Sequence, residues 1–102
     1  MLLLEYPGED SYRKFYDAVL NLAEGDGALA RRKLEHLSPE EIPELRAQYY
    51  YFLGESRLCT NDRQGAAAAF RMELENLTGS ARKQRVQNRI RELETMPETS
   101  GR

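Results

Sequence analysis

Residues 47–59 read AQYYYFLGESRLC and place four aromatic side chains in succession, directly before a Leu-Gly pair. Successive side chains of an α-helix point about 100° apart, so consecutive rings point in different directions. A single buried face cannot accept all of them. The stretch from Tyr49 to Phe52 therefore predicts a helix that has neighbours on several sides.

Apolar residues elsewhere recur at the spacing of amphipathic helices, and no stretch alternates clearly with the period of a strand. We expect an all-α fold in which antiparallel helical hairpins stack side by side. The third helix is expected to begin near Pro43, because this proline cannot donate to the carbonyl of Pro39. The apolar stripes predict five helices, near residues 10–24, 27–37, 43–59, 62–77 and 80–94.

The chain of 102 residues has the size of one small domain. Residues 10–95 are expected to form a helical domain, residues 1–9 an N-terminal arm and residues 96–102 a flexible tail. The arm begins MLLL, which is expected either to dock on the domain or to bind a partner. No apolar run is long enough to span a membrane, and the single cysteine allows a reducing compartment, so a cytoplasmic location is expected.

The chain lacks the residue patterns that catalysis and metal binding need. Its one histidine, His36, and its one cysteine, Cys59, have no second His or Cys at metal-ligand spacing. The GDG sequence at residues 25–27 is interpreted as a turn between helices rather than a phosphate-binding loop. We therefore expect a protein that is not an enzyme and has neither a cofactor nor a metal ion.

Similar residues recur at an offset of 36 positions along the chain. One pair lies in predicted turns, and the other two lie in the helices that follow these turns. A constant offset of this kind predicts two copies of a helix-turn-helix unit. The pairs are Asp26 and Asp62, Ala30 and Ala66, and Leu34 and Phe70.

Residues 47–80 resemble one tetratricopeptide (TPR) repeat, a unit of about 34 residues. The family pattern has a large aromatic residue, a Leu-Gly pair, a small residue and a second aromatic residue. Those places are taken, without a gap, by Tyr50, Leu53, Gly54, Ala66 and Phe70. The chain departs from the pattern at Arg57, where a tyrosine is usual, at Glu73, where a small residue is usual, and at Thr78, near the usual proline.

Residues 11–46 match the family more weakly, since Lys14 and Asp17 stand where large apolar residues are usual. The resemblance implies a short TPR-like solenoid of about two repeats with a C-terminal capping helix. In that stack Tyr49 would lean on the preceding repeat, Tyr50 would face its partner helix and Tyr51 would face the groove. Two further groups are expected to be buried: Leu53, Gly54, Ala66 and Phe70 in one contact within the repeat, and Val86, Ile90 and Leu93 on the helix at 62–77.

The resemblance also implies a function, the binding of another protein by an adaptor, scaffold or chaperone-like module. Its groove would take a peptide segment, and rings beside arginines suit a segment with acidic and apolar residues. The places where TPR domains hold the C-terminal carboxylate of heat-shock chaperones carry Tyr51, Phe52 and Glu55, so that clamp is not expected. The candidate partner-binding residues are Tyr12, Phe15, Tyr51, Glu55, Arg82, Arg85 and Arg89.

Several alternatives remain open at this point. Tyr12 and Phe15 can instead fill the core. The row formed by Arg82, Arg85 and Arg89 can be a solvent-exposed edge with ordinary ion pairs. The last helix can also be rotated, so that its arginines face away from the groove. Two other functions compete: self-association through apolar end faces, and nucleic-acid binding through the basic helix 80–94. The net charge of −2 argues against nucleic acid.

Overall fold

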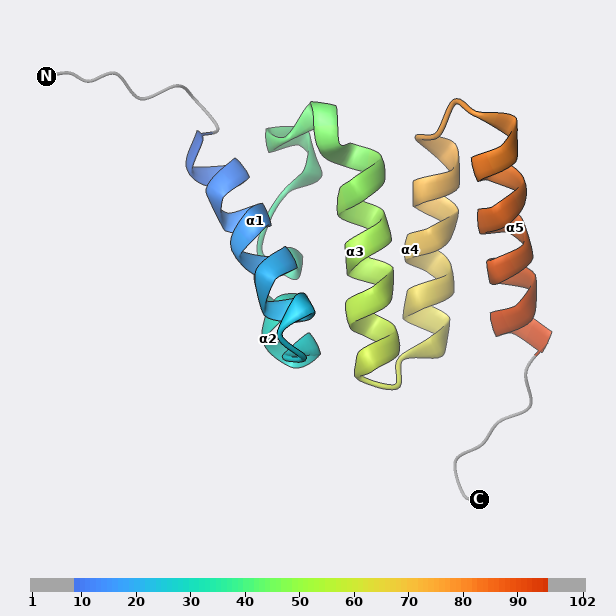
Figure 1. Ribbon diagram of the computed structural model, residues 1–102, viewed down its shortest axis with the longest axis horizontal. Helices are drawn as coiled ribbons and strands as arrows, with labels where there is room; N and C mark the ends of the chain where they lie inside the picture. Colours follow the sequence, from blue (N-terminus) through green and yellow to red (C-terminus); the bar gives the residue numbers. More distant parts are fainter. Residues whose placement is uncertain (1–8, 96–102) are drawn as a thin grey trace, which may run out of the picture.

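The computed structural model describes residues 9–95, and these form five α-helices joined by short connections (Figure 1). No strand occurs within this range, so the all-α prediction is confirmed. The remainder of the predicted arm and tail, residues 1–8 and 96–102, lies outside the described residues. The helices are α1 (Glu9–Ala23), α2 (Gly27–Glu35), α3 (Arg46–Cys59), α4 (Arg63–Glu75) and α5 (Ser80–Thr95).

The third helix begins later than the sequence predicts. α3 starts at Arg46 rather than near Pro43, and two short 3-10 helices, η1 (Pro39–Glu41) and η2 (Pro43–Leu45), precede it. A proline fixes its own φ angle and lacks an N–H, so each of the two prolines starts a turn that does not continue the turn before it. Ile42, between the two turns, is fully buried and anchors this connection.

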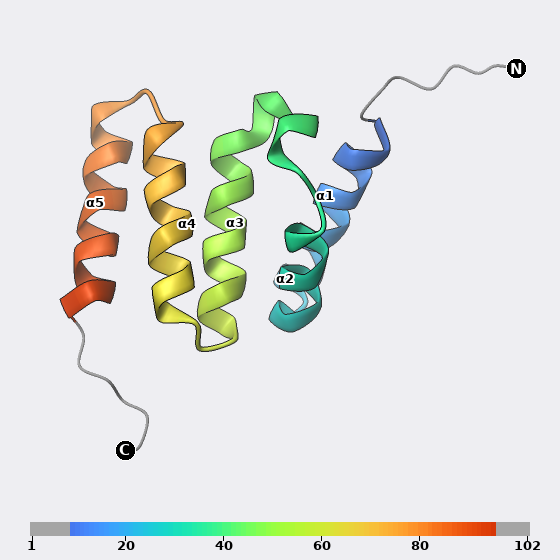
Figure 2. The ribbon, with the colours of Figure 1, turned by 180° about the vertical axis from the view of Figure 1, so that it is seen from behind.

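Consecutive helices run antiparallel and pack on one another, and they follow each other along one row (Figures 1 and 2). α1 also contacts α3, so the first and third helices meet on one face of the row. α4 lies between α3 and α5 at the other end. Among the described helices, α5 is therefore the last of the row and has a neighbouring helix on one side only.

The turn between α1 and α2 and the turn between α3 and α4 share one backbone geometry. Gly25 and Asn61 both have positive φ angles, of 92° and 64°. The next residue in each turn, Asp26 or Asp62, accepts a hydrogen bond from the backbone N–H three residues later and so caps the following helix. Each aspartate also donates its own N–H to a carbonyl five residues earlier, at 2.8 Å. The offset of 36 residues is thus present in the turns themselves.

Buried apolar side chains form two clusters. The first joins α1, α2 and α3, extends to α4, and includes Phe15 and Tyr49. The second joins α4 and α5 through Ala66, Phe70 and Ile90, and the half-buried Val86 and Leu93 pack against it. The predicted packing of the last helix on α4 is confirmed.

α3 and α4 approach each other closely at Gly54. A Cβ atom at this position would lie 2.5 Å from the Cε1 atom of the Phe70 ring, so no larger residue fits without movement. Leu53, Gly54, Ala66 and Phe70 are all buried, as predicted. They do not form a single contact, however, because Leu53 belongs to the first cluster and Phe70 to the second.

The four rings of α3 have different surroundings, which accounts for their succession. Tyr49 is buried, and its hydroxyl donates to two carbonyls at the end of α2, at 2.7 and 3.0 Å. Tyr50 and Phe52 are half-buried against the first cluster. Tyr51 stays 37% exposed on the face that carries the candidate site.

Two arginines link the ends of α2, α3 and α4. Arg31 contacts Glu35 at 2.9 Å and Asp62 at 3.0 Å. Arg57, at the place where the TPR pattern has a tyrosine, contacts Glu35 at 3.4 Å and donates to the carbonyl of Gly65 at 3.0 Å. Arg57 therefore makes polar contacts that connect three helices.

Candidate functional site

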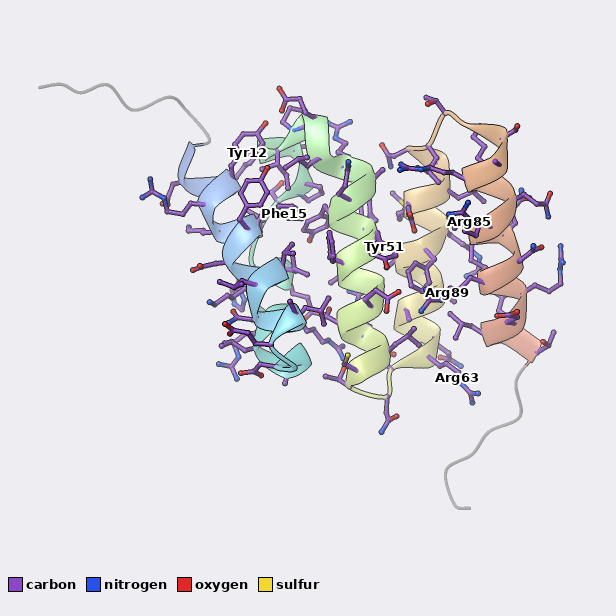
Figure 3. The ribbon with its side chains drawn as sticks, in the orientation of Figure 1. Tyr12, Phe15, Tyr51, Arg63, Arg85 and Arg89 are labelled. Atoms are coloured by element: carbon purple, nitrogen blue, oxygen red, sulfur yellow. The ribbon has the colours of Figure 1, made fainter. Side chains whose placement is uncertain are left out.

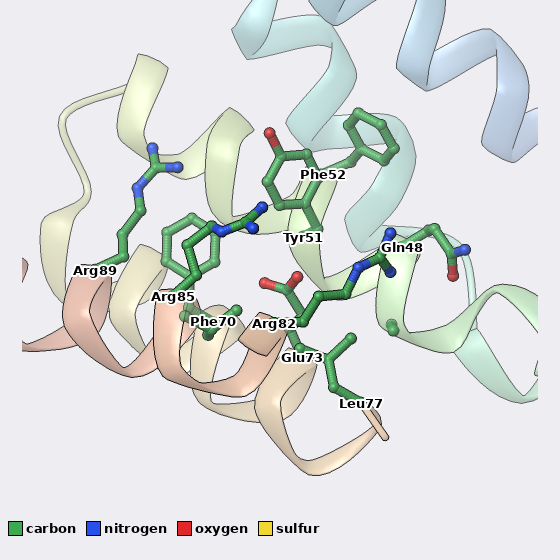
Figure 4. A pocket seen from close by; sticks show the side chains of 11 residues that line it. Gln48, Tyr51, Phe52, Phe70, Glu73, Leu77, Arg82, Arg85 and Arg89 are labelled. Carbon is green, nitrogen blue, oxygen red and sulfur yellow. The ribbon is translucent and has the colours of Figure 1, made fainter. Parts of the chain in front are cut away.

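A pocket of about 450 Å³ opens between α3, α4 and α5, and we call it the α3–α5 pocket (Figure 4). α3 and α5 form its walls, and α4 lies between them. The residues that line it are Ala47, Gln48, Tyr51 and Phe52 of α3, Phe70 and Glu73 of α4, Leu77 just after α4, and Arg82, Arg85, Val86 and Arg89 of α5.

A continuous series of rings leads from α1 to this pocket. Tyr16 contacts Phe15 with ring centroids 5.4 Å apart, and Phe15 contacts Phe52 at 5.9 Å. Phe52 then meets Tyr51 at 4.9 Å, and Tyr51 meets Phe70 at 6.4 Å. Edge-to-face and tilted contacts at these distances are favourable for aromatic pairs. The series holds Tyr51 at the pocket with a defined orientation.

Arg89 closes one end of the pocket by contacts within the protein. Its guanidinium group lies 5.0 Å from the centroid of the Phe70 ring, a cation–π geometry. It also forms an ion pair with Glu55 of α3, with Nη1 and Oε2 2.7 Å apart. Both charges of this pair are therefore already compensated, and together they bridge α3 and α5.

Arg82 and Arg85 differ from Arg89 in having no ion pair with any other residue of the described range. Both side chains are exposed, and both line the pocket. A guanidinium group offers several N–H donors in a plane and pairs well with a carboxylate. The pocket thus presents two positive groups that no carboxylate of the described range neutralises by direct contact.

Glu73 is a buried carboxylate in the same pocket, with only 9% of the residue exposed (Figure 4). Its Oε1 atom is buried and has no hydrogen-bond partner among the described residues. Burial raises the pKa of this carboxyl, while the charges of Arg89 and Arg82 act in the opposite direction and Glu55 adds to the increase. A buried carboxylate oxygen without a hydrogen bond is unfavourable, so Oε1 of Glu73 is the least satisfied atom of the pocket among the described residues.

The structure brings some of the predicted site residues together and separates others (Figure 3). Tyr51, Arg82, Arg85 and Arg89 line one pocket, and Glu55 joins them through its ion pair with Arg89. The arginines lie on the face of Tyr51, so the alternative of a rotated last helix is not what the structure shows.

Tyr12 and Phe15 lie on α1 and do not line the pocket. Phe15 is 2% exposed, so the prediction of a groove residue is wrong here and the core alternative holds. It is buried because α1 packs against both α2 and α3. Tyr12 is half-buried, and its hydroxyl donates to the carboxylate of Glu44, which raises the pKa of the tyrosine.

Sequence reasoning missed the lining residues on α4 and the start of α3. Phe70 was expected in a buried contact, and Gln48 carried no signal at all. Glu73 did carry one, since it stands where the TPR pattern has a small residue, three positions after Phe70 on the same helical face. A charged residue on an otherwise apolar face can mark such a site.

Comparisons with protein-family models, with curated proteins and with solved structures found no match to this chain. Within residues 9–95, no helix has both the length and the apolar character needed to cross a membrane. The same range contains no group of three or more His, Cys, Asp or Glu side chains arranged to hold a metal ion.

Proposed function

We propose that this chain is a TPR-like, non-enzymatic module that binds a peptide segment of a partner protein in the α3–α5 pocket. One observation carries the proposal: an exposed ring, Tyr51, and two arginines without ion pairs, Arg82 and Arg85, line one pocket. Large rings and arginines are the residues most enriched at the energetic centres of protein interfaces. In this role the chain would act as an adaptor or scaffold in the cytoplasm.

The repeat geometry supports the TPR-like part of the proposal. The α1–α2 turn and the α3–α4 turn have the same backbone hydrogen bonds at an offset of 36 residues. The small residues Gly54 and Ala66 stand where the family pattern has its small residues; both are buried, and Gly54 lies against the Phe70 ring of α4. In this interpretation α1–α2 and α3–α4 are two repeats, and α5 is the capping helix.

The charges in the pocket favour a peptide with acidic and apolar residues. Carboxylates would pair with Arg82 and Arg85, and apolar side chains would contact Tyr51 and Val86. Nucleic acid is a weaker candidate, because a phosphate backbone would bring many negative charges close to Glu73 and Glu55. The net charge of −2 acts in the same direction.

The proposal is tested by isolating partners from the native extract with the tagged chain as bait, at low salt and after nuclease treatment. Tyr51→Ala and Arg85→Glu should each lose a partner that the wild type retains. Arg91→Glu is the matched control, since Arg91 is an exposed arginine of the same helix that does not line the pocket. Partners that bind wild type and Arg85→Glu equally would contradict the proposal, and binding that disappears with nuclease would favour nucleic acid.

A further inference from the structure

Glu73 conflicts with the ligand that the rest of the pocket favours. Arg82 and Arg85 attract an anion, yet a buried carboxylate lies in the same pocket. The Oε1 atom of this carboxylate has no hydrogen bond within the described range that would stabilise its charge. A pocket that only binds anions would gain nothing from an ionised carboxylate, because that carboxylate repels the ligand.

The charged and titratable groups around Glu73 come from both helices that pack on α4. Arg82, Arg85 and Arg89 belong to α5, whereas Glu55 and Tyr51 belong to α3. Arg89 is already paired with Glu55. The positive charges that favour the ionised form of Glu73 are those of Arg89 and Arg82, and of these two only Arg82 has no ion pair in the described range.

A bound acidic side chain would change this balance in two ways. It would place a second negative charge close to Glu73, which disfavours the ionised carboxylate. It would also pair with Arg82 and so weaken the stabilising effect of this arginine on the ionised form of Glu73. Both changes raise the pKa of Glu73 in the complex above its value in the free protein, which burial has already raised.

We propose that Glu73 takes up a proton when an acidic peptide side chain binds between Arg82 and Arg85, and that this proton makes the pocket selective for acidic ligands at low pH. The proposal rests on the proposed function and adds a specificity-determining residue to it. Protonated Glu73 also has an O–H group that can donate to the bound carboxylate, so one residue changes from a repelling group into a hydrogen-bond donor.

The direction of the pH dependence follows from linkage. Between the two pKa values of Glu73, in the free protein and in the complex, the complex holds more protons than the free protein, so affinity rises as the pH falls. One proton gives at most about a tenfold gain in affinity per pH unit. The carboxylates of the peptide itself titrate near about pH 4, and the comparison with a variant that lacks the Glu73 carboxyl separates their contribution from that of Glu73.

The experiment is calorimetric titration with a synthetic peptide in which Asp and Glu alternate with Leu and Phe. An analogue with Asn and Gln in place of the acids serves as the neutral probe. Titrations in two buffers of different ionisation enthalpy count the protons taken up per peptide bound. The wild type should take up as much as one proton, and its affinity for the acidic peptide should rise on acidification.

Glu73→Gln should bind the acidic peptide more tightly than the wild type at neutral pH, take up no proton and lose most of the pH dependence. Glu75→Gln is the matched control, because Glu75 is an exposed carboxylate of the same helix outside the pocket. This control should behave as the wild type. The neutral peptide should show weak binding that is independent of pH in all three proteins.

The outcomes separate this inference from the proposed function. If the wild type binds the acidic peptide and Arg85→Glu does not, but Glu73→Gln takes up the same proton as the wild type, the pocket stands and the role of Glu73 is overturned. If the acidic peptide binds neither the wild type nor Glu73→Gln, the proposed function fails as well. Should Glu73→Gln not fold, an NMR titration of the Glu73 carboxyl carbon in the wild type decides, since an equal pKa with and without peptide overturns the inference.

Discussion

Two buried polar side chains, Tyr49 and Glu73, differ in whether their buried oxygen atom is hydrogen-bonded. The Tyr49 hydroxyl is out of water but donates to two carbonyls at the end of α2. The Oε1 atom of Glu73 is equally out of water and has no partner in the described part of the chain. A buried polar group stabilises a fold only when it is hydrogen-bonded, so Tyr49 contributes to stability, whereas the Oε1 atom of Glu73 does not.

Tyr49→Phe should lower the free energy of unfolding by about 1–3 kcal/mol, because two buried carbonyls lose their shared donor while the ring stays in place. Tyr16→Phe, at an exposed ring of α1, should change it by less than about 0.5 kcal/mol. Denaturant unfolding at neutral pH measures both. Equal stability of Tyr49→Phe and the wild type would show that these hydrogen bonds contribute nothing.

Tyr49→Phe should also change how the free energy of unfolding depends on pH in the alkaline range. Burial raises the pKa of Tyr49 to about 12, whereas an unfolded tyrosine titrates near about 10. Between these values the unfolded state loses its proton first, so stability falls with rising pH, by at most about 1.4 kcal/mol per pH unit. Tyr49→Phe lacks this contribution, and its stability should fall less steeply than that of the wild type above pH 10.

At the scale of single elements, the α1–α2 turn and the α3–α4 turn are close copies in backbone geometry that differ in their side-chain contacts. Asp26 and Asp62 each cap the following helix through a backbone N–H three residues later. Asp62 also forms an ion pair with Arg31 of α2, at 3.0 Å, and so connects elements that are not consecutive. The two turns thus form a natural pair for separating the effect of a cap from that of a tertiary contact.

Asp26→Ala should lower the free energy of unfolding by about 1 kcal/mol, the usual effect of losing an N-cap. Asp62→Ala should cost more, by a few tenths to about 1 kcal/mol, because the partly exposed ion pair is lost as well. The excess should disappear when both substitutions are measured in an Arg31→Ala background. An equal cost of the two substitutions in the wild-type background would mean that this ion pair does not stabilise the fold.

The close approach of α3 and α4 gives a second prediction at this scale. Ala66 is fully buried in the second cluster, so Ala66→Leu should overpack it and cost about 1–3 kcal/mol. Ala68→Leu, on the exposed side of the same helix, is the control and should be nearly neutral. A loss under about 0.5 kcal/mol for Ala66→Leu by denaturant melting would show that the contact has space to adjust.

At the scale of the whole molecule, the α3–α5 pocket exists only while α5 stays docked on α4. α5 is the last helix of the described row, and it rests on the second cluster through Ile90 and the half-buried Val86 and Leu93. Its remaining surface is mostly polar and exposed. A terminal helix with a small buried face can open locally without unfolding the rest, which couples the stability of the row's end to binding.

Ile90→Ala should therefore destabilise the docking of α5 more than it destabilises the rest of the fold. We expect a cost of about 2–4 kcal/mol, seen mainly as lost hydrogen-exchange protection in α5, with α1 to α3 still protected. Binding of the acidic peptide should weaken together with this protection, since Arg82 and Arg85 are part of α5. Gln87→Ala, at an exposed position of α5, is the control. Uniform loss of protection along the chain would instead show that the fold is one cooperative unit.

Much of the fold could be predicted because its causes are local. Apolar spacing, glycine and aspartate in the turns, and the prolines before α3 act over a few residues, and the predicted helices other than α3 agree with the structure to within two residues at each end. The predicted start of α3 was wrong because Pro39 and Pro43 are compatible either with a helix or with two successive 3-10 turns. Local rules do not decide between these two conformations. The burial of Ile42 between the two turns favours the turns.

By itself the sequence determined an all-α chain, its repeated turns, the packing of α5 on α4 and an arginine row beside an apolar stripe. Only the tertiary structure decided which faces meet: that Phe15 is buried between helices, that the arginines lie on the face of Tyr51, and that Glu73 enters their pocket. The physical reason is that helical periodicity defines a face but not its neighbour. The neighbour depends on how the helices approach one another. That approach is set by contacts between residues far apart in the sequence, such as that of Gly54 with Phe70.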